Sequence, residues 1–248
     1  MSETPLPAAV QGLLAWWLPR AEVACGDALR AMLLYGSVVL GDFQAGWSDV
    51  DVCAVLREPP SRTRERCLAE LHHATELAFV EGREGPWSSG QTVDLLVLYA
   101  AHGDLDHEHV QDAFDQLGLA TRTRVLAGES VTIAHPDRDA LSRRSMRLEQ
   151  EACSPPEGAS AIWYAAVLQL LARAVVFWRD GELVSKTRAL LRLIEERGQV
   201  AEAFELALRV RRGGSATAAR HTDELRGAHA VATPWALDGL ADWRRCLP

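Results

Sequence analysis

Apolar residues form short runs in the first half of the chain and long stretches of helical period in the second half. Residues 31–35, 50–56 and 92–99 have the length and apolar character of buried strands. Between the last two runs, residues 62–80 carry apolar positions at helical spacing and predict an amphipathic helix. Strands that alternate with helices predict an α/β sheet for this part of the chain.

The segment before the first predicted strand is also apolar at helical spacing. Residues 8–29 predict one helix, or two helices broken near Pro19. After the first strand, Gly36-Ser37 and a polar segment up to Ser48 predict a turn and a short helix.

The character of the chain changes near residues 136–157, where His135-Pro136 and Ser154-Pro155-Pro156 interrupt the pattern. Beyond them, four stretches have helical period, at residues 159–180, 186–197, 199–211 and 215–229. The expected fold class is therefore an α/β (α+β) domain with a mixed sheet at residues 1–140, followed by an all-helical domain at residues 141–248. The arginine pair Arg211-Arg212 is expected on a solvated helix face.

Composition narrows the possible classes of protein. The 248 residues are 48% hydrophobic, which is enough to bury substantial cores. A net charge of −8 argues against a dedicated binder of duplex nucleic acid, which needs a basic face. The cysteines lack metal or disulfide spacing. Because no secretory leader pattern or uninterrupted apolar span is present, we expect a cytoplasmic protein without a membrane segment, as a monomer or homodimer.

Three aspartates are the candidates for chemistry. Asp49 and Asp51 are two residues apart at the start of a predicted strand, so both carboxylates project to the same face. Such a pair repels itself unless a cation lies between the carboxylates, and oxygen ligands suit Mg²⁺. Asp94 begins another predicted strand. If the two strands are neighbours, Asp94 can be a third metal ligand or the base that deprotonates an acceptor hydroxyl.

A glycine and two serines accompany these acids. Gly36 allows a close approach of the backbone to a ligand, and Ser37 can donate hydrogen bonds to phosphate oxygens. Ser48, next to Asp49, is a further candidate contact of the nucleotide. The alternative interpretation is a chance Gly-Ser turn followed by a surface Asp-x-Asp.

The combination resembles the nucleotidyltransferase superfamily of the DNA polymerase beta type. The resemblance rests on Leu34-Tyr35-Gly36-Ser37, then Asp49-Val50-Asp51, then Asp94 in a later apolar strand. It implies that Asp49, Asp51 and Asp94 are catalytic carboxylates that bind Mg²⁺, and that a nucleoside triphosphate such as ATP is the co-substrate.

Within this superfamily the chain is most similar to the aminoglycoside adenylyltransferases of the streptomycin and spectinomycin type. Leu171-Ala172-Arg173 and the segment from Phe177 to Lys186 look like the C-terminal motif of that family. The resemblance implies that Lys186, the only lysine in the chain, contacts the triphosphate. The plainer alternative is that Gly181 caps a helix and Lys186 is a solvated residue of the next one.

One segment departs from the family. Those enzymes carry acidic residues near the start of the same helix to hold a cationic antibiotic, whereas this chain has Ala161-Ile162-Trp163-Tyr164-Ala165. Burying a polycation without paired carboxylates is costly, so the sequence does not determine the identity of the acceptor.

The sequence therefore predicts an enzyme, a Mg²⁺-dependent nucleotidyltransferase that transfers AMP from ATP to a hydroxyl of a small molecule. Aminoglycoside-type antibiotics, and hence antibiotic resistance, are one candidate. The alternatives are transfer to a protein partner, as in toxin–antitoxin nucleotidyltransferases, and a non-catalytic nucleotide-binding module. No nucleic-acid or membrane partner is expected. The run 102–109, rich in acids and histidines, and the pair His72-His73 are interpreted as solvated helix surface.

Overall fold

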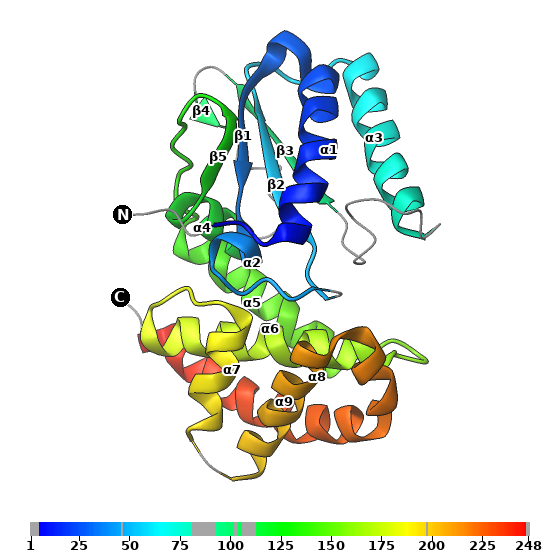
Figure 1. Ribbon diagram of the computed structural model, residues 1–248. Coiled ribbons are helices and arrows are strands. Elements are labelled where there is room, and N and C mark those ends of the chain that lie inside the picture. The colour runs from blue at the N-terminus through cyan, green and yellow to red at the C-terminus, as the bar shows by residue number, and fades with distance from the viewer. Residues whose placement is uncertain are drawn as a thin grey trace. The chain divides into compact units, whose positions relative to one another are not determined.

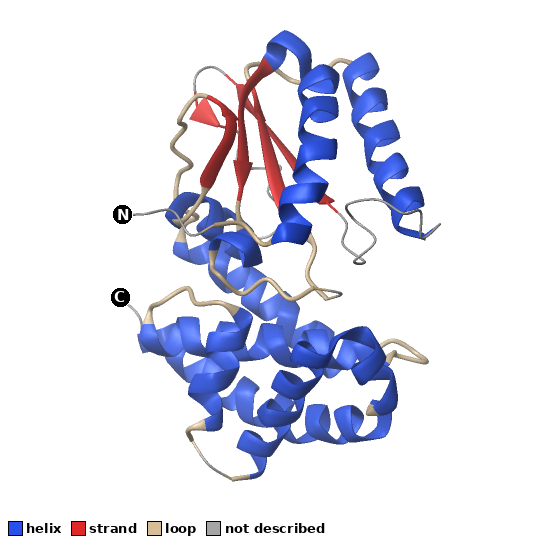
Figure 2. Ribbon diagram, viewed as in Figure 1, coloured by secondary structure: helices blue, strands red, loops and turns tan. Residues whose placement is uncertain are grey.

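The computed structural model describes residues 5–45, 47–80, 93–101, 104–105, 113–196 and 198–246. The chain divides into two units, Met1–Pro136 and Asp137–Pro248. Strands and helices build the first unit, whereas the described residues of the second are helices joined by loops (Figures 1 and 2). Most of the acidic and histidine-rich run at 102–109 lies outside the described residues.

The first unit is built around a mixed sheet. Its elements in chain order are α1 (Ala8–Cys25), the 3-10 turn η1 (Gly26–Ala28), β1 (Leu29–Leu34), α2 (Gly36–Val39), β2 (Val50–Leu56), α3 (Arg62–Val80), β3 (Val93–Ala101), β4 (Asp104–Leu105), α4 (Ala113–Thr121) and β5 (Arg124–Gly128). The strand order is β4-β3-β2-β1-β5. Strands β2 and β3 are parallel, and the other neighbouring pairs are antiparallel. The predicted fold class and the three predicted strands are confirmed.

Each face of the sheet is covered by a separate hydrophobic cluster. Met32 and Leu34 of β1 belong to the cluster that includes α1 and α3, and the two helices lie side by side over that face (Figure 1). The intervening Leu33 packs in the opposite cluster with Val55 of β2 and Leu119 of α4. This alternation follows from the period of two along a strand.

The N-terminal helix is continuous. Pro19 lies inside α1, whose buried residues include Trp17 before the proline and Ala21 after it. Of the two possibilities raised by the sequence, a single helix is therefore the correct one. The apolar side chains on both sides of Pro19 pack on the same core, which holds the helix together across the missing backbone donor.

The second unit contains five helices among its described residues, namely α5 (Arg138–Cys153), α6 (Ala161–Asp180), α7 (Lys186–Ile194), α8 (Gln199–Arg220) and α9 (Thr222–Cys246). The stretches predicted at 159–180, 186–197 and 199–211 correspond to α6, α7 and the first part of α8. The stretch predicted at 215–229 spans the end of α8 and the start of α9, which continues to Cys246. The sequence did not predict α5, which lies between the two proline-containing interruptions and is capped by the Asp137 side chain. Gly214 has a positive φ of 73° inside α8 and marks a kink there.

Helix α6 is the central element of this unit and packs against α5, α7, α8 and α9. It is long and apolar enough to meet the criteria for a membrane span, but 72% of that window is buried inside the structure. This degree of burial is that of a core helix.

Candidate active site

The parallel pairing of β2 and β3 brings two of the predicted carboxylates together. In that register Asp51 pairs with Asp94, so the two residues are direct neighbours across the strands. Asp51 lies on the same side of β2 as Cys53, and Asp94 lies on the same side of β3 as Leu98. These positions are on the face of the sheet opposite α1 and α3. The side chains of neighbouring residues in register project to the same face of a sheet.

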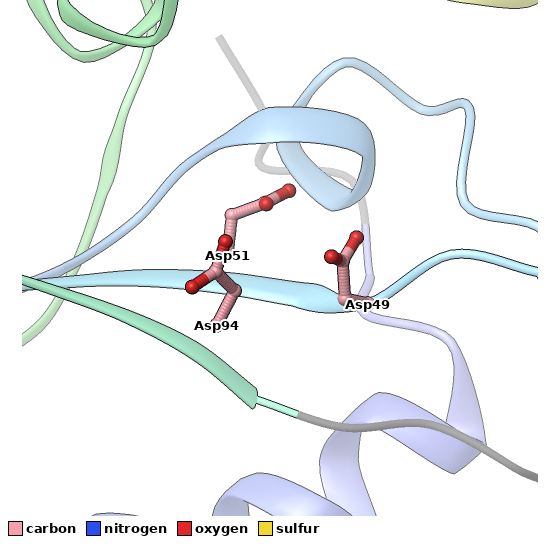
Figure 3. Close-up of side chains that lie close together, drawn as sticks. All are labelled: Asp49, Asp51 and Asp94. Carbon is pink, nitrogen blue, oxygen red and sulfur yellow. The ribbon is translucent and has the colours of Figure 1, made fainter. Parts of the chain in front are cut away.

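Asp49, two residues before Asp51, completes the group. Each of the three aspartates offers one carboxylate oxygen, and these oxygens all lie within 4.8 Å of one another. Asp49 and Asp94 are exposed, whereas Asp51 is half-buried. Figure 3 shows the three side chains projecting from the sheet toward the turn of α2. The structure thus brings together all three acids that the sequence nominated.

The turn of α2 is fitted closely around Asp51. The Tyr35 backbone N–H donates to the Asp51 carbonyl oxygen at 3.0 Å, which ties the end of β1 to β2. The Ser37 backbone N–H approaches Asp51 Oδ2 at 3.4 Å. Gly36 has φ +65°, and a Cβ at this position would lie 1.8 Å from Asp51 Oδ2. Only glycine therefore meets both the conformational and the steric requirement.

The two candidate serines differ in their hydrogen bonds. Ser37 Oγ is buried and has no hydrogen-bond partner among the residues that the structure describes. Ser48 is buried too, but its Oγ accepts a hydrogen bond from the Gln44 backbone N–H at 3.1 Å. Ser48 therefore secures the loop that leads into Asp49, and its contact with a nucleotide stays a prediction. The unsatisfied Ser37 hydroxyl is a group that a ligand oxygen could satisfy.

The surroundings of Asp94 raise the pKa of its carboxyl group. Its carboxyl reaches solvent, but the surrounding protein removes part of its hydration, and this is the main reason why the pKa of Asp94 is raised. The negative charge of Asp49 raises that pKa further, and His72 on α3 opposes the shift. His72 and His73 are exposed, as expected for helix surface.

The same acids influence Tyr35 at the end of β1. Burial is the main cause of the strongly raised pKa of the Tyr35 hydroxyl, and the charges of Asp115, Asp51 and Asp94 add to it. The phenol is 4% exposed and stays neutral. The sequence reasoning did not single out Tyr35, although it belongs to the Leu-Tyr-Gly-Ser motif.

These observations fit a divalent cation. Carboxylate oxygens within 4.8 Å of one another can share one or two ions. The like charges that raise the pKa of Asp94 would be offset by a cation at this position. The residues present therefore suit Mg²⁺, and Asp49, Asp51 and Asp94 would hold it.

The remaining predicted residue, Lys186, belongs to the second unit, where it begins α7. Ser185 is the N-cap of this helix, and its hydroxyl accepts a hydrogen bond from the Arg188 backbone N–H at 3.2 Å. Gly181 ends α6 with φ 70°, as a helix C-cap does. The loop between these two caps determines where the backbone of Lys186 lies.

Comparison with known families decides the class of the first unit. Residues 27–119 match the family model described as a nucleotidyltransferase domain. This part of the chain is a nucleotidyltransferase domain. The domain includes the Gly36-Ser37 turn and all three aspartates, so the predicted superfamily and the prediction of an enzyme of this type are confirmed.

A solved structure is also similar to this chain in fold. A crystal structure of spectinomycin adenyltransferase AAD(9) from Enterococcus faecialis, with ATP and spectinomycin, matches with a TM-score of 0.59 and 13% sequence identity. The match covers 87% of this chain and 99% of that chain. At this identity it shows a common fold, which confirms the predicted likeness to aminoglycoside adenylyltransferases at that level. No curated protein matches the chain by sequence.

Proposed function

We propose that this chain transfers AMP from ATP to a hydroxyl group of a small molecule in a Mg²⁺-dependent reaction. The observation that carries the proposal is the convergence of Asp49, Asp51 and Asp94 within 4.8 Å, beside the Gly36-Ser37 turn. The nucleotidyltransferase domain match over residues 27–119 supports the reaction type.

In this reaction the acceptor oxygen forms a bond to the α-phosphorus of ATP, and the bond from that phosphorus to the bridging oxygen breaks. Pyrophosphate leaves with the bonding electron pair, and the proton of the acceptor hydroxyl passes to a base. Asp94 is the proposed base, because its exposed carboxylate lies within 4.8 Å of the carboxylates of Asp49 and Asp51, at the place where the reaction would occur.

The other residues bind and orient. Asp49 and Asp51 would hold Mg²⁺ together with Asp94, and the bound ion would neutralise negative charge on the phosphates and on the leaving group. The Ser37 hydroxyl, which has no hydrogen-bond partner within the described part of the chain, is available to donate to a phosphate oxygen. Lys186 is proposed as a second phosphate contact on the strength of its motif.

The acceptor is the open part of the proposal. The start of α6 carries Trp163 and Tyr164, whose rings pack against His229 of α9 with centroids 5.5 and 5.2 Å away. The Arg226 guanidinium lies over the Tyr164 ring at 6.0 Å. This aromatic and cationic surrounding supports an acceptor with fewer positive charges than a typical aminoglycoside. Spectinomycin, present in the AAD(9) structure, is the first compound to test.

A cytoplasmic location and a monomeric or homodimeric state belong to the same proposal. ATP and Mg²⁺ are abundant in the cytoplasm, and Cys25, Cys53, Cys67 and Cys153 are free thiols.

The experiment is a pyrophosphate-release assay with ATP, Mg²⁺ and a panel of aminoglycosides, spectinomycin, lincosamides and simpler polyols. Acceptor-dependent release is expected, with an acceptor mass increase of one AMP. Asp51→Asn should reduce the rate on the order of 10²- to 10³-fold or more, whereas Asp242→Asn, in an exposed ion pair with Arg245, should not.

Binding of Mg·ATP without modification of any acceptor in the panel would overturn the small-molecule proposal. A partner protein that gained the mass of AMP would then identify the toxin–antitoxin type of transfer instead. Failure to bind Mg·ATP at all would overturn the enzyme proposal itself.

A further inference from the structure

Tyr35 occupies a position next to the acids of the proposed metal site. Strands β1 and β2 pair with Leu34 opposite Val52. The Tyr35 backbone N–H donates to the Asp51 carbonyl oxygen at 3.0 Å, so the antiparallel register continues one residue beyond β1 and places Tyr35 opposite Asp51. Asp51 in turn pairs with Asp94 across β2 and β3. Tyr35, Asp51 and Asp94 therefore form one row across the sheet.

The Tyr35 side chain lies on the same face of the sheet as these acids. Together with Leu33, two residues earlier, it belongs to the hydrophobic cluster on the face opposite α1 and α3. Opposed residues of an antiparallel pair have Cβ atoms roughly 4.5–5.5 Å apart, so the ring of Tyr35 stands beside the Asp51 side chain. Tyr35 is 4% exposed, and its ring is therefore held in place by the core around it.

The ring is the part of Tyr35 that is level with the Asp51 carboxylate. An aspartate carboxyl group is bonded directly to Cβ, whereas the tyrosine hydroxyl is separated from Cβ by the length of the ring. Burial is the main cause of the raised pKa of this hydroxyl, and among the charges Asp115 of α4 has the largest effect, ahead of Asp51 and Asp94. This order indicates that the hydroxyl extends past the two acids toward α4.

Asp51 is enclosed on another side by the turn of α2. A Cβ at Gly36 would lie 1.8 Å from Asp51 Oδ2, and the Ser37 backbone N–H approaches the same oxygen at 3.4 Å. Asp51 is accordingly half-buried, whereas Asp49 and Asp94 are exposed. Of the three acids, Asp51 is therefore the one whose orientation depends most on the surrounding protein.

We propose that Tyr35 is a positioning residue of the acid group, whose aromatic ring holds the Asp51 carboxylate against the α2 turn in an orientation that binds a divalent cation. The inference rests on the proposed function, in which Asp51 is a ligand of Mg²⁺, and it concerns residues of the first unit alone. A carboxylate that is already oriented loses less conformational freedom when it binds an ion, which strengthens binding. The phenol is neutral and adds no further charge to the group.

The test measures binding of Mn²⁺ to the full chain, without nucleotide or acceptor, from the electron paramagnetic resonance signal of the free ion. Mn²⁺ prefers the same oxygen ligands as Mg²⁺. Tyr35→Leu removes the ring but keeps an apolar side chain, and we expect it to weaken Mn²⁺ binding about tenfold or more. Tyr35→Phe keeps the ring and loses only the hydroxyl, so its Kd should stay within about twofold of the wild type.

Leu33→Val is the matched control for loss of core volume. Leu33 is 1% exposed, and its replacement by valine removes a similar volume from the same cluster as Tyr35→Leu does. It should lower the thermal midpoint but leave Mn²⁺ binding unchanged. Thermal unfolding of every variant establishes that the chain is folded. If Tyr35→Leu does not fold, Tyr35→Met takes its place, because methionine fills irregular gaps in a core without supplying a ring.

Combination with Asp51→Asn tests whether the ring acts through that carboxylate. Once Asp51 is replaced, Tyr35→Leu should have no further effect on Mn²⁺ binding. Unchanged affinity in folded Tyr35→Leu, an equal loss in Leu33→Val, or a loss in Tyr35→Phe as large as that in Tyr35→Leu would overturn the proposal. If Asp51→Asn alone leaves Mn²⁺ binding unchanged, the metal site of the proposed function fails and this inference fails with it.

Discussion

Asp51 of β2 and Asp94 of β3 occupy the same register position on two parallel strands. Because these strands are neighbours in the sheet, residues far apart in the sequence present their carboxylates to the same face. Asp49 joins them from the residue that precedes β2, so the group has two acids from one strand region and one from the next. The proposed reaction depends on this relationship, and the following predictions examine its parts.

Gly36 is predicted to be irreplaceable even by alanine. Its φ is +65°, and an added Cβ would lie 1.8 Å from Asp51 Oδ2, so Gly36→Ala must displace that carboxylate. We expect pyrophosphate release to fall about 10²-fold or more. Gly158 has φ +70°, but a Cβ added there would meet nothing within 4 Å, so Gly158→Ala tests backbone strain alone. Equal activity of both variants would contradict this account.

Substitutions of Ser37 and Ser48 are expected to affect different properties, ATP binding for Ser37 and folding stability for Ser48. Ser37→Ala removes a hydroxyl that has no hydrogen-bond partner among the described residues, so we expect unchanged or slightly higher stability and about tenfold weaker Mg·ATP binding. Ser48→Ala removes the acceptor of the Gln44 N–H and should cost about 1 kcal/mol of unfolding free energy. Denaturant unfolding and ATP titration of both variants check this pattern. Lower stability with unchanged ATP binding in Ser37→Ala, and the opposite result in Ser48→Ala, would refute it.

The ionised carboxylate of Asp94 is expected to lower the stability of the metal-free fold. Burial and then the charge of Asp49 raise its pKa in the folded state, so the folded chain holds this proton more tightly than the unfolded chain does. Ionisation of Asp94 therefore destabilises the fold above the folded pKa, and the effect disappears below the ordinary aspartate pKa of about 4.

Asp94→Asn is accordingly expected to raise the thermal midpoint of the metal-free chain at neutral pH while abolishing turnover. The difference from the wild type should close as the pH falls below about 4, and saturating Mg²⁺ should narrow it at neutral pH. Thermal scans across pH, with and without Mg²⁺, measure this. A lower midpoint for Asp94→Asn at neutral pH would show that the carboxylate stabilises the apo site.

His229 should make the helical unit sensitive to acid. Burial lowers the pKa of this imidazole, and a hydrogen bond with the Ala152 backbone opposes the shift only in part. The unfolded chain therefore takes up a proton below about pH 6.5 that the folded chain resists, and stability falls as the pH decreases through this window.

His229→Asn should lose about 1 to 3 kcal/mol at neutral pH through the removed ring, but show a flatter decline between neutral pH and pH 5. The exposed His73 of α3 provides the matched control, because His73→Asn should reproduce the wild-type pH dependence. Denaturant unfolding at several pH values gives the comparison, and a decline as steep as that of the wild type in His229→Asn would exclude the assignment.

Much of the catalytic domain follows from local sequence pattern. The apolar runs predict β1, β2 and β3, and residues 62–80 coincide with α3. The Gly36-Ser37 turn and the acids at residues 49 and 51 are equally local features, because strand alternation alone places those two carboxylates on one face. The motif order then carries the resemblance to nucleotidyltransferases, which the family match over residues 27–119 confirms.

Other features depend on contacts between distant segments and have no local signal. The pairing of β2 with β3, and hence the position of Asp94 opposite Asp51, is a property of the assembled sheet. Helix α5 was not predicted, because it lies between the two proline-containing interruptions at residues 135–136 and 154–156, which mark the segment as a boundary. Arg211 looked like a surface residue beside Arg212, and only the packing of three helices shows that it is buried.

The sequence by itself determined which residues could do chemistry, since residue type and spacing along one strand or turn are fixed by covalent order. The tertiary structure alone decided which of them meet, because the distance between residues on separate elements depends on pairing register and helix packing. Asp49 and Asp51 illustrate the first case. Asp94 with Asp51, and Arg211 with Thr187, illustrate the second.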